Sequence, residues 1–294
     1  MVYMLQCGIK SPRATQRLVC NPGVVSETLA CFYASAAVNW FENKVNQFTA
    51  ARTPYEPGLH KAVHVGCKLM ATLKDILKGR RERIIQRLLK HGISDVEISF
   101  LRYLMFDDKK FATPYEVGCR IIIIYAIVYT IEEPTKKEAV INWLKAENIW
   151  EHVGKREAQY LKEKEINQAQ INELSWQLEA AYVLAWALNL VRDRPSPTGS
   201  VSDEQMDEFF NNLVPLGASL VDFLSRLSYR DTGEIFEENI FYELTTTYFR
   251  DLLFNGNEDK TDIDRITAFE RHKALNWLRR FMDIEKWEET DTST

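Results

Sequence analysis

Two positions place a charged side chain where helical periodicity predicts a protein core. Glu179 shares one helical face with Tyr182, Val183 and Trp186, at spacings that bring side chains together on a helix. Arg120 stands in a segment that is apolar nearly all round. Because a buried charge without a partner is costly, each of these positions requires a hydrogen-bonding or oppositely charged neighbour.

A third such position lies in the last predicted helix. Its apolar arc consists of Ile266, Ala274, Trp277, Leu278 and Phe281. Glu270 and Arg271 fall inside this arc. By the same periodicity, His272, Asn276 and Arg279 are expected outside it.

One hypothesis joins these charges in a single site. Arg120, Glu179 and Arg271 would meet in a buried ionic network at the floor of a cleft. Trp176 or Trp186 would line that cleft, as aromatic side chains commonly do in ligand pockets. The site would then belong to an enzyme or a small-molecule-binding protein.

The alternative is that these charges are structural. They would pair across a helical bundle and fix its register, with Glu116 also pairing to Arg120 at i, i+4. We favour this interpretation because structural ion pairs bury charges as active sites do. A Glu179→Gln variant separates the two: unfolding indicates a structural role, whereas a folded variant that loses a ligand indicates a site.

Other candidate sites are less specific. His60, His64 and Cys67 share a helical face, but a fourth zinc ligand and a HExxH motif are missing, so we predict no metal site. Residues 255–262 are acidic but lack the Gly and Glu of a calcium-binding EF-hand. The basic run 78–90 has no interleaved aromatic residues, which favours an exposed helix face.

The sequence has no GxSxG, P-loop or GxGxxG motif, and we predict no catalytic residue and no cofactor.

The helix that must position Glu179 is predicted at residues 175–190. This stretch has no Gly or Pro and is apolar on every side, which is typical of the middle of a bundle. It is shorter than the roughly 20 apolar residues that span a bilayer, and it contains Gln177 and Glu179. Small side chains along it allow neighbouring helices to approach closely: Ala180, Ala181, Ala185 and Ala187.

Helices account for nearly all of the remaining chain. Residues 26–50 and 59–77 are predicted to form an N-terminal hairpin. Thr113, Pro114 and Glu116 form a capping box that begins another helix. The other predicted helices cover residues 79–90, 113–131, 135–147, 155–164, 203–213, 216–227, 235–254 and 262–282. Residues 194–201, rich in Pro, Ser and Gly, are predicted to be a linker.

Composition limits the class of protein. The chain has 294 residues, 46% of them hydrophobic and 27% charged, with a net charge of −5. This balance gives no general reason to bind nucleic acid or an acidic membrane surface, and no transmembrane segment or signal peptide is predicted. The cysteines are scattered and form no CxxC pair, which is typical of reduced thiols in the cytoplasm: Cys7, Cys20, Cys31, Cys67 and Cys119.

From residue 80 onward the order of these signals resembles a known family. The residues that carry the resemblance are Arg80-Arg81-Glu82, residues 88–93, Glu116-Val117-Gly118-Cys119-Arg120, Trp143-Leu144, Asn148-Ile149-Trp150, Glu157, Ser175-Trp176-Gln177-Leu178-Glu179-Ala180, Trp186-Ala187-Leu188, residues 270–278, Trp287 and Asp291-Thr292. Together they are similar to a bacterial family called domain of unknown function 4272. Residues 98–110 depart from the family's usual Leu-Pro-containing approach to the capping box. The resemblance implies a helical, cytosolic bacterial protein and no particular activity.

These observations predict an all-α protein, a multi-helix array with an N-terminal helical hairpin packed on a C-terminal helical body. Residues 1–79 would be the N-terminal extension, and residues 80–294 the family-like domain. We expect a non-enzymatic binding or protein-interaction module in the cytoplasm, with an unknown protein or small-molecule partner. The enzyme or small-molecule-binding protein described above is the alternative. The sequence does not specify an oligomeric state.

Overall fold

The computed structural model describes residues 57–94, 96–163, 167–290 and 292, with side chains described from residue 72 onward. This part of the chain contains nine α-helices, joined by loops and short 3-10 helices, and no β-strand. The all-α prediction is therefore confirmed. Predicted helix 26–50, and with it the hairpin, lies outside the described residues.

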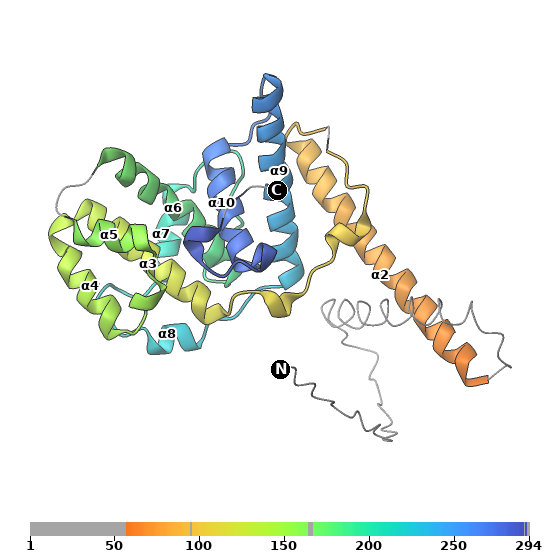
Figure 1. Cartoon of the computed structure of the whole chain (residues 1–294), viewed down its shortest axis with the longest axis horizontal. Coiled ribbons are helices and arrows are strands. Elements are labelled where there is room, and N and C mark those ends of the chain that lie inside the picture. The colour runs from red at the N-terminus through yellow and green to blue at the C-terminus, as the bar shows by residue number, and fades with distance from the viewer. Residues whose placement is uncertain (1–56, 95, 164–166, 291, 293–294) are drawn as a thin grey trace, which may run out of the picture.

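Helix α6 (Gln168–Ala187) lies at the centre of the body. On one side it packs against α3 (Pro114–Glu132), and on the other against α10 (Arg265–Leu278). Helix α9 (Thr232–Asn255) packs on α10, and α2 (Pro57–Lys90) packs on α9, as Figure 1 shows. Residues 179–187 of α6 are all buried. The prediction that this helix lies in the middle of the bundle is therefore confirmed.

Helix α3 begins where the capping box predicts. The Glu116 amide donates to Thr113 Oγ1 at 3.2 Å, and the Thr113 amide donates to Glu116 Oε2 at 2.6 Å. Among the described residues, this helix alone is long and apolar enough to cross a membrane by length and composition. Of that apolar window, 61% is buried inside the protein, and core helices pass the same test.

Shorter helices cover the outer side of α3 and α6. They are α4 (Lys137–Ala146), α5 (Lys155–Lys162), α7 (Asp203–Asn211) and α8 (Val221–Ser225). The predicted helix at 216–227 is reduced to α8, because Gly217 adopts a positive φ of 92°. The last predicted helix ends at Leu278 rather than at 282, because Arg280, Met282 and Asp283 all adopt left-handed backbone conformations.

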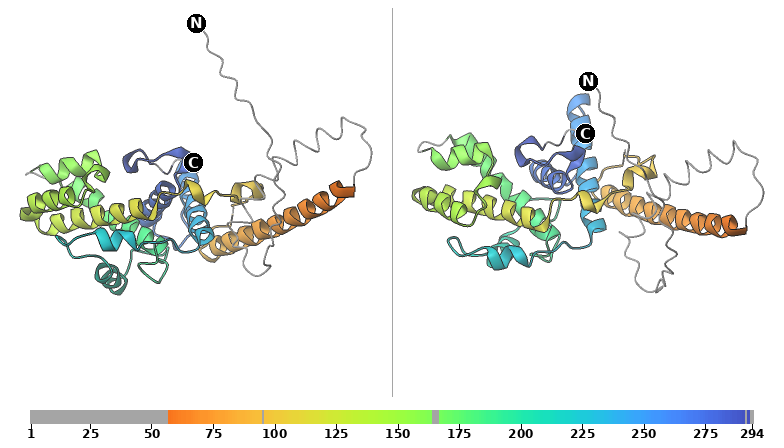
Figure 2. Two further views of the ribbon diagram at one scale, coloured as in Figure 1. Left: turned by 90° about the horizontal axis from the view of Figure 1, so that it is seen from below. Right: turned by 60° about the horizontal axis from the view of Figure 1, so that its bottom comes forward.

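Helix α2 is one continuous helix of 34 residues, where the sequence suggested two consecutive segments. Its C-terminal half lies along α9, and its N-terminal half extends beyond the body (Figure 2). The helix stops at Lys90, and Gly92 follows with a φ of 85°. A glycine in this conformation just past the last turn is a common helix terminator.

The contribution of the capping box to the stability of α3 can be measured. Burial alone would raise the pKa of Glu116, but hydrogen bonds from Thr113 and the positive charge of Arg280 outweigh burial and lower that pKa. Thr113→Ala should therefore reduce the free energy of unfolding by about 1 kcal/mol at neutral pH. A lowered carboxyl pKa stabilises the fold above the unfolded value of about 4.3. That contribution is lost as the pH falls through the folded value, so the cost of Thr113→Ala should shrink in acid.

Urea denaturation of wild type and variant across pH measures this difference. The exposed Thr135→Ala substitution is the control, with no expected pH dependence. A cost for Thr113→Ala that stays constant into acid would contradict the role given to Glu116.

Candidate functional site

Glu179 has the cationic partner that its buried position requires. Arg271, from α10, donates two hydrogen bonds to Glu179 Oε2, from Nε at 3.1 Å and from Nη2 at 2.6 Å. Both side chains are almost completely buried between α6 and α10. Shared hydrogen bonds of this kind are what make a buried ion pair tolerable.

The same two side chains bind the segment at residues 194–201, which we call the strap. Arg271 Nη1 donates to the Ser196 carbonyl at 2.6 Å, and Nη2 donates to the Gly199 carbonyl at 3.1 Å. The Val201 amide donates to Glu179 Oε1 at 2.9 Å. The predicted linker is thus a coil segment whose backbone is held against the ion pair.

Arg120 does not join this pair. Its Nη2 donates to Glu157 of α5 at 2.7 Å, and both residues are buried. The Arg120 guanidinium also lies 5.0 Å from the Trp287 ring centroid. The predicted charges therefore form two separate buried pairs, Arg120–Glu157 and Glu179–Arg271, instead of one network of three charges.

The two tryptophans proposed for a cleft have different environments. Trp176 is 37% exposed on the surface of α6. Trp186 is buried, with the guanidinium of Arg230 at 4.1 Å and that of Arg194 at 5.1 Å from its ring centroid. Trp186 thus lies beneath two arginines: Arg230 lines a hollow at the surface, and Arg194 lines a neighbouring cavity.

That cavity lies between α2 and the beginning of α9 and has a volume of about 450 Å³. We call it the arginine cleft. Its lining residues are Arg83, Ile84, Arg87, Arg194, Asp231, Glu234, Glu237 and Phe241. None of the predicted site residues is among them, and only Trp186 touches the cleft, through Arg194.

Glu237 anchors one wall of the arginine cleft. It accepts hydrogen bonds from Arg83 at 2.5 and 3.0 Å and from the fully buried Arg80 at 3.3 Å. Arg80 also donates to the Leu104 carbonyl at 2.8 Å and faces the ring of Phe106. The basic run predicted to be an exposed helix face is therefore partly a packing interface.

Glu238 anchors the other wall. It is fully buried and is held by both Nη atoms of Arg87, with the Nη2–Oε1 distance 2.9 Å, and by Arg194 at 3.2 Å. Arg87 also stacks on Phe241, 3.7 Å from the ring centroid. Burial alone would lower the pKa of Arg87, but the charge of Glu238 outweighs burial and raises it.

Sequence reasoning missed the arginine cleft, although a signal was present. Arg80, Arg83 and Arg87 recur at i, i+3 and i+7, which puts them on one face of a helix. Glu237 and Glu238 stand together in a helix that is otherwise rich in apolar side chains. A row of arginines on one helix and a pair of carboxylates on another indicate that the two helices pack against each other.

Tyr242 lies between the charged pair at the arginine cleft and the central ion pair. Tyr242 lies one turn beyond Glu238 on α9, and Arg271 Nη1 donates to its hydroxyl oxygen at 3.0 Å. Burial raises the pKa of Tyr242. Tyr242 is therefore hydrogen-bonded to Arg271 and also feels the charges of Glu238 and Arg87.

The prediction that His272 and Asn276 fall outside the buried face of the last helix is wrong. Thr246 and His272 are joined by a hydrogen bond of 2.7 Å, and Asn239 donates to Asn276 at 2.9 Å, both inside the α9–α10 interface. Helix α10 is covered on two sides, by α6 and α9. Its polar residues are therefore buried against the polar residues of α9, while Ile266 of the predicted apolar arc is exposed.

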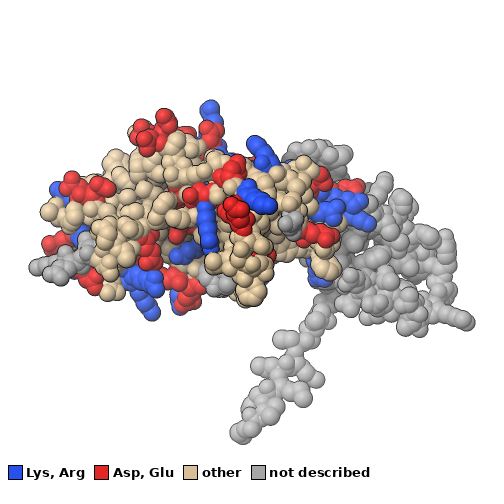
Figure 3. All heavy atoms as spheres, turned by 90° about the horizontal axis from the view of Figure 1, so that it is seen from above, with Lys and Arg blue, Asp and Glu red and all other residues tan. Residues whose placement is uncertain are grey.

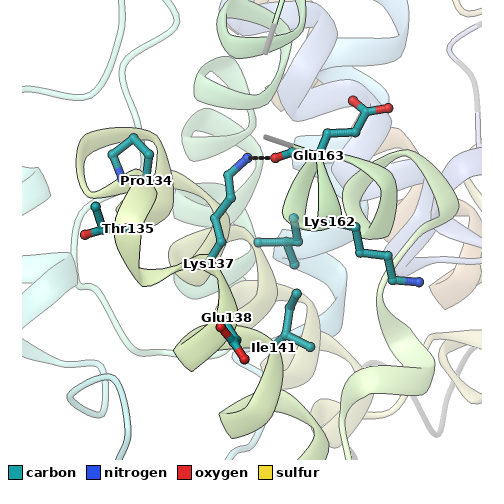
Figure 4. Close-up of a pocket in the computed structure, with 8 residues that line it drawn as sticks. Pro134, Thr135, Lys137, Glu138, Ile141, Lys162 and Glu163 are labelled. Atoms are coloured by element: carbon teal, nitrogen blue, oxygen red, sulfur yellow. Dashed lines mark hydrogen bonds between the residues drawn. The ribbon is translucent and has the colours of Figure 1, made fainter. Parts of the chain in front are cut away.

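A second pocket, of about 550 Å³, lies between α4 and the C-terminal end of α5 (Figure 4). Lys137 reaches across it and donates to the carbonyls of Tyr160 at 2.7 Å and Glu163 at 3.1 Å. Burial lowers the pKa of Lys137. Since a lysine commonly satisfies the last carbonyls of a helix, Lys137 acts here as a cap for α5.

No group of three or more His, Cys, Asp or Glu side chains suited to a metal ion occurs among the described residues. The side chains of His60, His64 and Cys67 lie outside them. Cys119 is completely buried in α3.

Residues 80–290 match the family described as Domain of unknown function (DUF4272), and the chain belongs to this family. The match begins at Arg80, the buried arginine of the α2–α9 interface, and it includes the strap and α10. No curated protein matches the sequence. No solved structure matches it either.

Replacing Glu179 tests the role of the central ion pair. Glu179→Gln leaves the Arg271 charge buried without its counter-charge, so we expect the free energy of unfolding to fall by about 3–5 kcal/mol. Glu173→Gln is the matched control on the same helix, because Glu173 forms an exposed pair with Arg156. Exposed pairs contribute at most about 1 kcal/mol. If urea denaturation showed the same small change for both variants, the structural role of Glu179 would be refuted.

The environment of Cys119 predicts low reactivity. Burial raises the pKa of its thiol to about 11, so the reactive thiolate is scarce near neutral pH and is shielded from solvent. Iodoacetamide should leave Cys119 unmodified in the native protein and should label it in urea. Peptide mass spectrometry measures both states. Rapid labelling of Cys119 in the native protein would show that it is an accessible nucleophile.

Proposed function

We propose that this protein is a non-enzymatic binding module of the bacterial cytoplasm, and that it takes an anionic small molecule in the arginine cleft. The observation that carries the proposal is the convergence of three arginines on one cavity from two distant segments. Arg83 and Arg87 come from α2, and Arg194 comes from the strap. Guanidinium groups present several N–H donors in a fork that matches carboxylate and phosphate oxygens.

The cleft arginines are positioned before any ligand arrives. Arg87 is fixed by Glu238 and Phe241, and Arg83 is fixed by Glu237. The side chains of Arg83 and Arg194 remain 58% and 38% exposed, so a ligand in the cleft can reach both. Binding groups that are already ordered cost less entropy when the ligand binds.

The charge distribution supports local recognition rather than a general attraction to polyanions. Basic and acidic side chains alternate over the face shown in Figure 3 and do not gather into one positive field. Nucleic-acid binding usually relies on an extended basic surface. A compact anion that fits the arginine cleft is the better match.

The buried charges also support a binding module over an enzyme that would use Arg120, Glu179 and Arg271. Glu179 and Arg271 are paired with each other and hydrogen-bonded to the strap. Arg120 is paired with Glu157. All are sealed between helices, where they stabilise the packing of the body.

The test is isothermal titration calorimetry with citrate and inorganic phosphate as probes, on wild type, Arg83→Gln and Arg194→Gln. These two arginines are chosen because their carboxylate partners each keep a second arginine, which is Arg80 for Glu237 and Arg87 for Glu238. Hydrogen bonds to charged groups are worth about 1.5–3 kcal/mol. Each variant should therefore bind at least one of the anions roughly tenfold more weakly or worse.

Arg156→Gln is the charge-matched control, since Arg156 lies on the surface of α5 in an exposed pair. It should bind as wild type does, and binding should weaken as salt is added. If neither anion binds the wild type, or if both cleft variants bind them unchanged, the proposal is refuted.

A further inference from the structure

A second hollow, whose lining is more acidic, adjoins the arginine cleft. This hollow has a volume of about 750 Å³. It is lined by Asp108, Asn189, Tyr229, Arg230, Asp231, Thr232 and Glu234. Asp231 and Glu234 line both cavities, so the two lie next to each other at the first turn of α9, and we call them together the groove.

The single arginine of the second hollow is directed toward the protein. Arg230 donates to the Trp186 carbonyl at 2.5 Å and to the Val191 carbonyl at 3.2 Å, and it stacks on the Trp186 ring. Its nearest carboxylate contact is Glu234, at 3.7 Å. Arg230 therefore serves mainly as a fixed support, and the carboxylates set the charge at this end of the groove.

The acidic end is ordered as well. Asp231 caps α9 by accepting a hydrogen bond from the Glu234 amide at 3.0 Å. Asp108 accepts one from the Thr232 hydroxyl at 3.3 Å. The Glu234 side chain is about half exposed at the junction of the two cavities, where a ligand in either cavity can meet it.

We propose that the groove recognises a zwitterion, whose anionic group binds Arg83 and Arg194 and whose ammonium group binds Glu234 and Asp231. This inference rests on the proposed function, and it specifies the ligand class of that same site. A ligand that carries only negative charge would place part of itself against the carboxylates of α9. Like-charge contacts of that kind discriminate against the wrong ligand.

A matched series of three probes tests the inference: ε-aminocaproate, which is a zwitterion, caproate, which keeps only the carboxylate, and hexylamine, which keeps only the ammonium group. Wild type should bind ε-aminocaproate about tenfold more tightly than either of the others, as expected for one added charged hydrogen bond. Calorimetric titration gives the ratio directly.

Variants assign each end of the probe. Glu234→Gln should reduce the affinity for ε-aminocaproate to that for caproate and leave caproate binding unchanged. Arg194→Gln should weaken binding of both compounds. Glu173→Gln, which makes the same charge change on exposed α6 surface, should behave as wild type.

The two proposals fail in different ways. If citrate, phosphate and caproate bind, but ε-aminocaproate binds no better than caproate, the zwitterion inference is overturned and the anion-binding function stands. If hexylamine binds most tightly and no anion binds, both are overturned. Preference for ε-aminocaproate that survives in Glu234→Gln would refute the role given to the acidic end.

Discussion

The buried pair of Glu179 and Arg271 is the interaction on which the body of this protein depends. It joins the central helix α6 to α10 at a point where both are covered by other helices. An isolated charge there would be strongly destabilising, so neither residue is tolerable without the other. Because the pair also binds backbone groups of the strap, the position of residues 194–201 follows from the packing of α6 on α10.

A second ionic layer organises the side of the molecule that faces α2. Consecutive carboxylates on α9, Glu237 and Glu238, hold three arginines of α2 and one of the strap. The buried face of α2 therefore combines these charged side chains with core residues such as Leu77, Ile84 and Leu88, whereas packing of α3 on α6 is apolar. The arginine cleft lies where the ordered charges of this interface are within reach of solvent.

The apolar architecture could be predicted from the sequence, because periodicity and caps act locally. Helix α3 begins at its capping box, and α6 is the core helix that its all-round apolar pattern indicated. The requirement for a partner of Glu179 could be stated, but not the partner's identity, since Arg271 is 92 residues away in the chain. Arg120 does not join the predicted network and pairs instead with Glu157 on the adjacent α5.

The arginine cleft was harder to foresee for a related reason. Periodicity on a single helix separates an apolar face from a polar one, but it does not say whether the polar face meets water or another polar face. For α2 and for α10 it meets α9, so Arg80, His272 and Asn276 are buried. Whether such side chains are buried depends on which helices become neighbours, and that is a property of the whole fold.

The way in which the strap is held has a consequence for how this family can diverge. Ser196, Gly199 and Val201 contribute only main-chain carbonyl and amide groups to the ion pair, so their side chains are not part of that contact. Substitution at these positions is constrained by backbone conformation and loop length rather than by side-chain chemistry. Insertions or deletions in the strap should therefore be rarer among relatives than replacements, while Glu179 and Arg271 should change only together.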